Sequence, residues 1–190
     1  MGLTLILAPS GEPITLAEAK LHCRVDSADD DALIAALIVA TRNQAEDRTG
    51  RALVTQKWRL DLDGFPIDAV EIPLPPLVSV ESITYLDSNG VRQTLDAAEY
   101  QVVANETPGR LLPANGKSWP GCRVAPGSVQ ISFTAGYGAA AVVPQAIKQW
   151  MLLQIGHGYG VREAVSVGDS VAAMPYVDTL LDPYRVLRFA

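Results

Sequence analysis

The chain has 190 residues, of which 48% are hydrophobic and 19% are charged, so it is not a disordered polypeptide. It is long enough for one domain, or for a core with an insertion. Its formal net charge of −6 argues against a surface that grips nucleic acid, because binding to phosphates requires clustered lysine and arginine.

The N-terminal run MGLTLILAPSG has no basic n-region and is too short for a signal peptide. No window approaches the ~18 apolar residues that a membrane-spanning helix needs. We therefore expect a soluble protein.

Two helices are predicted after this run. Thr15 opens the sequence T-L-A-E, a capping box in which Thr15 and Glu18 satisfy each other's amides, so a short helix is expected from about Leu16 to His22. A second helix is predicted to begin at Ser27–Asp30 and to end at Arg48–Gly50, where a basic last turn precedes a glycine suited to the left-handed cap.

The second helix carries two faces. Along its flank, Ala32, Ala36 and Ala40 form a ridge of small side chains that lets another backbone approach closely. This ridge packs either within the chain or against a neighbouring subunit. A broad core-facing stripe follows the 3.6-residue period and consists of Leu33, Ile34, Leu37, Ile38, Thr41 and Ala45.

The hydrophobic period then becomes alternating. Val54 to Leu62 is predicted as a strand with one face inward, and Pro66 ends it. Asn89-Gly90 predicts a tight hairpin with positive φ angles. The middle of the chain is therefore expected to be an antiparallel β unit, whose other strands are Val70–Leu74, Val78–Leu86, Val91–Leu95, Tyr100–Val103, Gly109–Leu112 and Ser128–Thr134.

A helix returns at Gln145 to Ile155, after Pro144 at a first helical position. This helix is apolar on nearly all sides, which predicts burial in the core or between subunits. Trp150 and Leu152 are its candidate subunit contacts.

These elements predict an α+β fold, in which N- and C-terminal segments form a helical bundle with an inserted antiparallel β unit. We expect an N-terminal helical segment at residues 1–52 and the inserted β unit at 53–138. A core helix that completes the bundle is expected at 139–165, and a C-terminal extension at 166–190.

No motif of a hydrolase, a zinc protease or a phosphate-binding loop occurs in the sequence. His22 and His157 fit helix-end positions better than a role as a base. With Cys23 and Cys122 they match no zinc spacing. The aspartates at 29–31 fit the favourable end of a helix dipole. We therefore expect no enzyme, no cofactor and no metal site.

Taken as an ordered set, several segments resemble the head–tail connector (adaptor, or head-completion) proteins of long-tailed phages, prophages and phage-derived gene transfer agents. They span nearly the whole chain. The stretches 99–127 and 165–176 depart from the family pattern, and their roles stay open. The segments that carry the resemblance are Glu12–Asp26, Asp30–Trp58, Leu74–Gly90, Phe133–Gly138, Val143–Tyr159 and Leu180–Arg185.

The resemblance implies a structural subunit of a ring, usually a dodecamer, that docks beneath the portal protein and joins the capsid vertex to the tail. DNA would pass through its channel without specific binding. The protein would be made in the host bacterial cytoplasm and reside in the neck of the virion, next to a tail-side neck, stopper or terminator protein. In such rings helices form the inter-subunit core and the C-terminal segment reaches the portal, so the predicted portal contacts are Pro183, Tyr184, Arg185 and Arg188.

Two alternatives stay open. One is a tail-terminator or other neck or tail ring component, whose β unit would self-associate through sheet edges. The other is a small hydrolase built on the loop around Trp119, which would need a nucleophile–base pair. No serine in the sequence has a plausible histidine partner for that chemistry.

Overall fold

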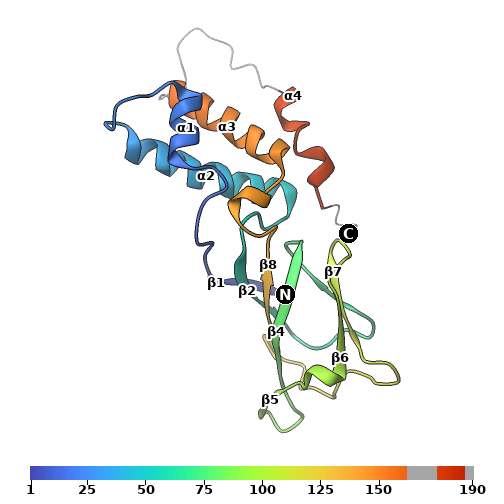
Figure 1. Ribbon diagram of the computed structural model, residues 1–190. Helices are drawn as coiled ribbons and strands as arrows, with labels where there is room; N and C mark the ends of the chain where they lie inside the picture. Colours follow the sequence, from blue (N-terminus) through green and yellow to red (C-terminus); the bar gives the residue numbers. More distant parts are fainter. Residues whose placement is uncertain (162–174, 187–190) are drawn as a thin grey trace. The chain divides into compact units, whose positions relative to one another are not determined.

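The computed structural model describes residues 1–161 and 175–186 (Figure 1). Its contacts divide the chain into two compact units. The β unit consists of Met1–Ser10 and Val54–Tyr137, and the helical unit consists of Gly11–Leu53 and Gly138–Ala190. Helices and antiparallel sheets thus occur in separate units, and the predicted α+β class is confirmed.

The first two helices follow the local signals in the sequence. α1 spans Leu16–Cys23 and begins at the predicted capping box. Thr15 Oγ1 accepts the Glu18 amide at 3.2 Å, and Glu18 Oε2 accepts the Thr15 amide at 2.7 Å. α2 spans Asp31–Thr49 and ends at Gly50, whose φ of +68° is a left-handed conformation that favours glycine.

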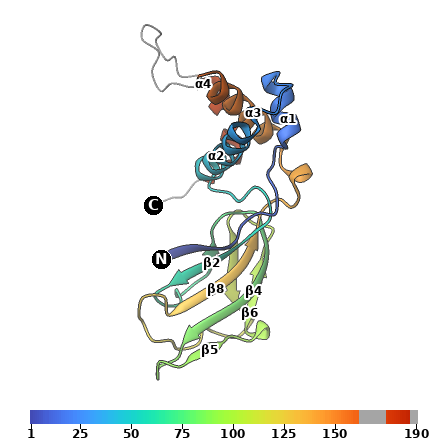
Figure 2. The same cartoon turned by 90° about the vertical axis from the view of Figure 1, so that its left-hand side faces the viewer.

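The core of the helical unit lies where α3 (Gln145–Gly160) packs against α1 and α2 (Figures 1 and 2). Leu33, predicted on the core-facing stripe, is instead 38% exposed. It lies at the edge of the helix face that carries the buried residues of α2. The fully or nearly fully buried apolar side chains of the three helices are Ala19, Ile34, Ile38, Ala45, Ile147, Trp150, Met151 and Ile155.

Short elements complete the helical unit. The 3-10 helix η2 (Ala140–Val142) precedes α3. The helix α4 (Pro175–Asp178) and the 3-10 helix η3 (Asp182–Tyr184) form the described part of the C-terminal segment. Val177 and Leu181 are 1% and 0% exposed, so this segment packs onto the unit through its own apolar side chains.

The β unit contains two antiparallel sheets, and Figure 2 shows the larger one with its strands side by side. Its strand order is β1-β2-β8-β4-β5, formed by Gly2–Leu7, Gln56–Leu62, Val129–Ala135, Leu77–Leu86 and Arg92–Thr94. The smaller sheet has the order β3-β7-β6, formed by Val70–Ile72, Gly109–Pro113 and Tyr100–Val103, and the 3-10 helix η1 (Ala97–Glu99) precedes β6.

On the alternating strand β2, Gln56 and Leu60 are buried, whereas Trp58 and Leu62 are half-buried. Leu60 pairs with Ile131, and Ile131 pairs with Ile83 on the other side, and all three are 0% exposed. Such a row fixes the register, because a slip by one residue would turn these side chains to the opposite face.

Two local features differ from the sequence predictions. β1 is an edge strand in residues that were expected to belong to the N-terminal helical segment and for which no strand is predicted. Its run L-T-L-I-L lacks a clean alternation, so periodicity gives no strand signal. In the β4–β5 hairpin only Gly90 has a positive φ, and the Asp87 carboxylate holds the turn by accepting the amides of Asn89 and Val91.

Gly136 marks the end of β8. It has a φ of +127°, and its amide donates to the carbonyl of Pro76 at 2.9 Å. A Cβ at this position would lie 2.7 Å from the backbone oxygen of Val54, a distance that real side chains do not adopt. The turn after β8 therefore requires glycine for both conformation and space.

Candidate functional site

Among residues 1–161 and 175–186, no group of three or more His, Cys, Asp or Glu side chains is placed to hold a metal ion. Cys23 and Cys122 are free thiols. His22 packs against its own chain, because a Cβ at Gly156 of α3 would lie 3.1 Å from the His22 Nε2 atom. No helix in the described part of the chain is long and apolar enough to cross a membrane.

The loop around Trp119 is held by packing contacts. The indole ring stacks on Phe65 with ring centroids 4.9 Å apart and planes inclined by 6°. Its Nε1 donates to the carbonyl of Asp68 at 2.9 Å. Phe65 also meets Tyr85 edge-on, with ring centroids 5.8 Å apart. Trp119 thus anchors the loop to the rest of the β unit.

α2 presents an apolar face on its outer side. Ala32, Ala36 and Ala40, the predicted ridge, are all exposed and make no part of the subunit's core. Leu33 and Val39 flank them at 38% and 40% exposure. We call these five residues the α2 face. Sequence reasoning found its alanines but missed Leu33 and Val39, because helical periodicity does not tell which of two apolar stripes a single chain buries.

The other two predicted interface residues lie elsewhere. Trp150 is 0% exposed, so its side chain is inside the helical unit of a single chain. Leu152 is half-buried on α3. The structure therefore does not bring either residue to the α2 face.

Trp150 joins α2, α3 and α4. Its Nε1 donates to Asp178 Oδ1 at 3.0 Å, and the Arg48 guanidinium lies over its ring at 5.4 Å from the centroid. Arg48 Nη1 also forms an ion pair with Asp178 Oδ2 at 2.7 Å. The hydrogen bond from Trp150, and then the one from Arg48, hold the pKa of Asp178 below its ordinary value, against the opposing effect of burial.

The predicted portal contacts lie on the C-terminal segment, next to the end of α2. Pro183 and Arg185 are exposed and Tyr184 is half-buried. Two hydrogen bonds to its backbone hold this stretch. The Tyr184 carbonyl accepts a hydrogen bond from Arg51 Nε at 2.5 Å, and the Val186 amide donates to the Thr49 carbonyl at 2.8 Å. Arg188 lies outside the described residues.

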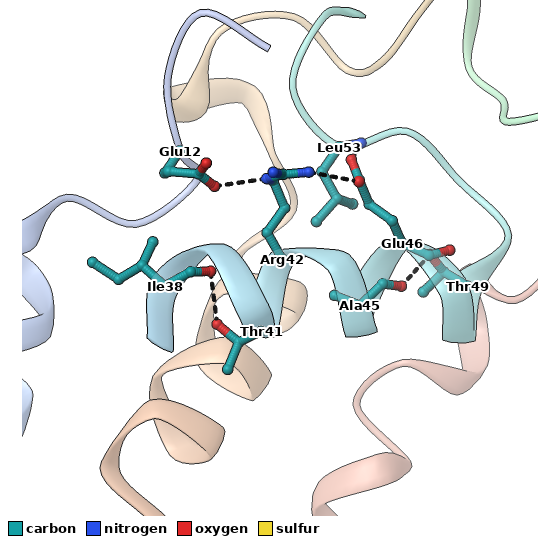
Figure 3. A network of polar contacts seen from close by, with 8 residues as sticks. All are labelled: Glu12, Ile38, Thr41, Arg42, Ala45, Glu46, Thr49 and Leu53. Atoms are coloured by element: carbon teal, nitrogen blue, oxygen red, sulfur yellow. Dashed lines mark hydrogen bonds and ion pairs between the residues drawn. The ribbon is translucent and has the colours of Figure 1, made fainter. Parts of the chain in front are cut away.

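A network of polar contacts centres on Arg42 of α2 (Figure 3). Arg42 Nε pairs with Glu12 Oε2 at 2.7 Å, and its Nη1 pairs with Glu46 Oε2 at 2.9 Å. The second oxygen of Glu46 accepts the Leu53 amide at 2.9 Å. The side chain of Arg42 is only 11% exposed, so these contacts are largely shielded from water. The network ties both ends of the segment Gly11–Leu53 to the middle of α2.

Part of this network carries a sequence signal. Arg42 and Glu46 are separated by four residues on one helix, a spacing that favours an ion pair. Glu12 is 30 residues from Arg42 along the chain, and no local pattern predicts that contact.

The model of the phage gp6-like head–tail connector protein family matches residues 13–106. No curated protein matches the chain. Solved structures do: a chain in the neck of an empty gene transfer agent (GTA) particle, computed with sixfold symmetry, is 27% identical, with a TM-score of 0.82. The match covers 100% of this chain and 98% of that one.

Two further solved structures resemble the chain over the same extent, 100% of this chain and 98% of the other. A chain in the virion of a native GTA particle is 28% identical, with a TM-score of 0.82. A chain in the neck of a native GTA particle, computed with twelvefold symmetry, is 28% identical, with a TM-score of 0.76.

Proposed function

This chain belongs to the phage gp6-like head–tail connector family, and from that premise we propose that it forms a ring beneath the portal protein that links the capsid vertex to the tail. The family and the similar neck chains are structural components of particles, so the chain is a structural protein of the virion neck and not an enzyme.

The observation that carries the ring is the α2 face. It exposes Leu33 and Val39 beside three alanines on a helix whose other side is buried in the core. Contiguous apolar surface of this kind is typical of protein contacts. A chain of similar fold occurs in a GTA neck that was computed with twelvefold symmetry, which favours a dodecamer over a dimer.

Mixing the purified chain with portal rings should give twelvefold neck rings in electron micrographs. Ala36→Arg should weaken this assembly by about hundredfold or more, because it places a charge in a packed apolar contact. Ala141→Arg, at an exposed alanine of η2 outside the α2 face, is the matched control and should assemble like the wild type. Equal assembly of both variants would remove the α2 face from the interface.

We assign the portal contact to the side chains of Pro183, Tyr184 and Arg185. Pro183 and Arg185 are exposed and Tyr184 is half-buried on a segment whose backbone is already tied to Thr49 and Arg51, so the subunit presents them without further folding. A tail-side neck, stopper or terminator protein would occupy the other end of the ring.

The double variant Tyr184→Ala, Arg185→Glu should lower portal binding by about tenfold or more, since aromatic and arginine side chains dominate many interfaces. It leaves the hydrogen bonds to the backbone of the segment in place. Arg92→Glu, at an exposed arginine of β5, serves as the control. Biolayer interferometry against immobilised portal rings measures both variants, and unchanged binding by the double variant would refute the assignment.

We propose that the channel of the ring lets DNA pass without specific binding. The support is the formal net charge of −6, because an acidic surface repels the phosphate backbone. Fluorescence anisotropy with labelled duplex DNA at low salt should give no binding at micromolar protein. Tight binding under those conditions would contradict this part of the proposal.

A further inference from the structure

A closed ring needs two different contact surfaces on every copy. In a cyclic assembly of more than two subunits each contact is heterologous, so the face that one copy offers meets another face of its neighbour. The α2 face is one such surface. The surface that contacts it on the neighbouring copy should be apolar and exposed in the single chain. Any charged residue at the edge of that surface should be opposite in sign to the charged residue that it meets at the edge of the α2 face.

α1 carries a surface of that kind. Leu21 is 81% exposed, the highest value among the large hydrophobic side chains of the described helical unit. Ala17 lies one turn before it on the same side, and Arg24, the C-cap residue, lies at the next position along that line. All three are exposed, whereas Ala19 on the opposite side of α1 is 0% exposed. We call Ala17, Leu21 and Arg24 the α1 face.

The two faces are complementary in shape. The α2 face has a low centre, because Ala32, Ala36 and Ala40 follow one another at every fourth position. A single protruding leucine fits over such a line of small side chains, as a ridge fits a groove in helix packing. Leu21 is the large side chain of α1 that stands out from its helix in this way.

They are also complementary in charge. The line of the α2 face continues through Asn43 to Asp47, both exposed. The line of the α1 face ends in Arg24. Neither Arg24 nor Asp47 forms an ion pair with another residue in the described ranges 1–161 and 175–186. Each is therefore available for a charge on a neighbouring subunit.

We propose that the α1 face of one copy packs on the α2 face of the next copy around the ring. Leu21 sits over the alanine line, and Arg24 of one copy pairs with Asp47 of the other. The occupant of the α2 face is thus a second copy of this chain. This inference rests on the proposed ring and specifies which surfaces close it.

Charge reversal tests the pairing. Arg24→Asp and Asp47→Arg should each weaken ring assembly by about tenfold, because each places two like charges in contact. The double variant restores an opposite pair with its polarity exchanged and should recover assembly to within about threefold of the wild type. Native mass spectrometry of the full-length chain, with and without portal rings, measures the fraction in rings.

Leu21→Asp tests the apolar part of the contact. It should weaken assembly by about 10- to 100-fold, the contribution of burying one leucine side chain. Val142→Asp is the matched control, since Val142 is a 60% exposed aliphatic residue outside both faces. Thermal unfolding should leave both variants as stable as the wild type, because neither side chain belongs to the core.

The outcomes separate this inference from the proposed function. Wild-type protein that forms no ring with the portal contradicts the proposed function itself. Rings that form equally well with Leu21→Asp, or a double charge reversal that fails to recover assembly when each single variant is impaired, overturn the pairing of the two faces and leave the ring intact.

Discussion

Replacing Trp150 with alanine should lower the free energy of unfolding of the helical unit by about 3–5 kcal/mol, the usual effect of removing a fully buried large aromatic side chain. Trp150 is 0% exposed, and Arg48 lies over its ring. The indole N–H also donates to Asp178, so alanine removes a contact that holds α4 to α3. Urea unfolding followed by helical circular dichroism measures the change.

Trp150→Phe separates packing from hydrogen bonding. Phenylalanine keeps an aromatic ring beneath Arg48 but has no N–H, so we expect a smaller loss of about 1–2 kcal/mol. Equal losses for Trp150→Phe and Trp150→Ala would mean that the hydrogen bond to Asp178, and not the buried ring, dominates the contribution of this residue.

The difference in unfolding free energy between the wild type and Trp150→Phe should depend on pH. The pKa of Asp178 lies below its ordinary value of 3.8 in the folded state, chiefly because of the hydrogen bond from Trp150. A carboxyl with a depressed folded pKa adds stability that is fully present above its unfolded pKa and is lost as pH falls through the folded value. The stability difference between wild type and Trp150→Phe should therefore shrink as pH falls below 3.8 and stay constant near neutrality.

Local signals in the sequence predict most of the helical boundaries. The capping box at Thr15 and the glycine at position 50 act within a few residues, and both appear where the sequence places them. The alternation of β2 likewise predicts that Leu60 faces the core, although Trp58 and Leu62 on the same predicted face are only half-buried. These features depend on neighbours along the chain, which a sequence pattern contains.

Features that depend on distant neighbours were not predicted. β1 is a strand because it pairs with β2, although its own residues show no alternation. The sequence leaves Trp150 in either a core or an interface position. The structure places it in the core, where its indole N–H donates to Asp178 of α4. The exposure of Leu21 likewise depends on which side of α1 faces α3, and eight helical residues give too short a pattern to decide it.

Arg42 gives the second large expected effect. Arg42→Met should destabilise the helical unit by about 3 kcal/mol, because it removes the cation that the shielded carboxylates of Glu12 and Glu46 share. Glu12 and Glu46 are only 27% and 13% exposed, so water compensates them poorly. Urea unfolding followed by helical circular dichroism measures the loss, and Arg42→Lys, which keeps the charge but only one of the two contact directions, should lose less.

A double-mutant cycle shows whether the loss comes from the stranded charges. If it does, adding Glu12→Gln to Arg42→Met should recover part of the stability, since one uncompensated carboxylate is then removed. In both variants Glu46 still accepts a hydrogen bond from the Leu53 amide. The contact at the C-terminal end of the segment Gly11–Leu53 is therefore the same in the two proteins. An Arg42→Met protein within about 0.5 kcal/mol of the wild type would place the network among exposed ion pairs of little energetic weight. The low exposure of Arg42 favours the loss of about 3 kcal/mol. Methionine carries no charge, so Glu12 and Glu46 would keep their negative charges while remaining shielded from water.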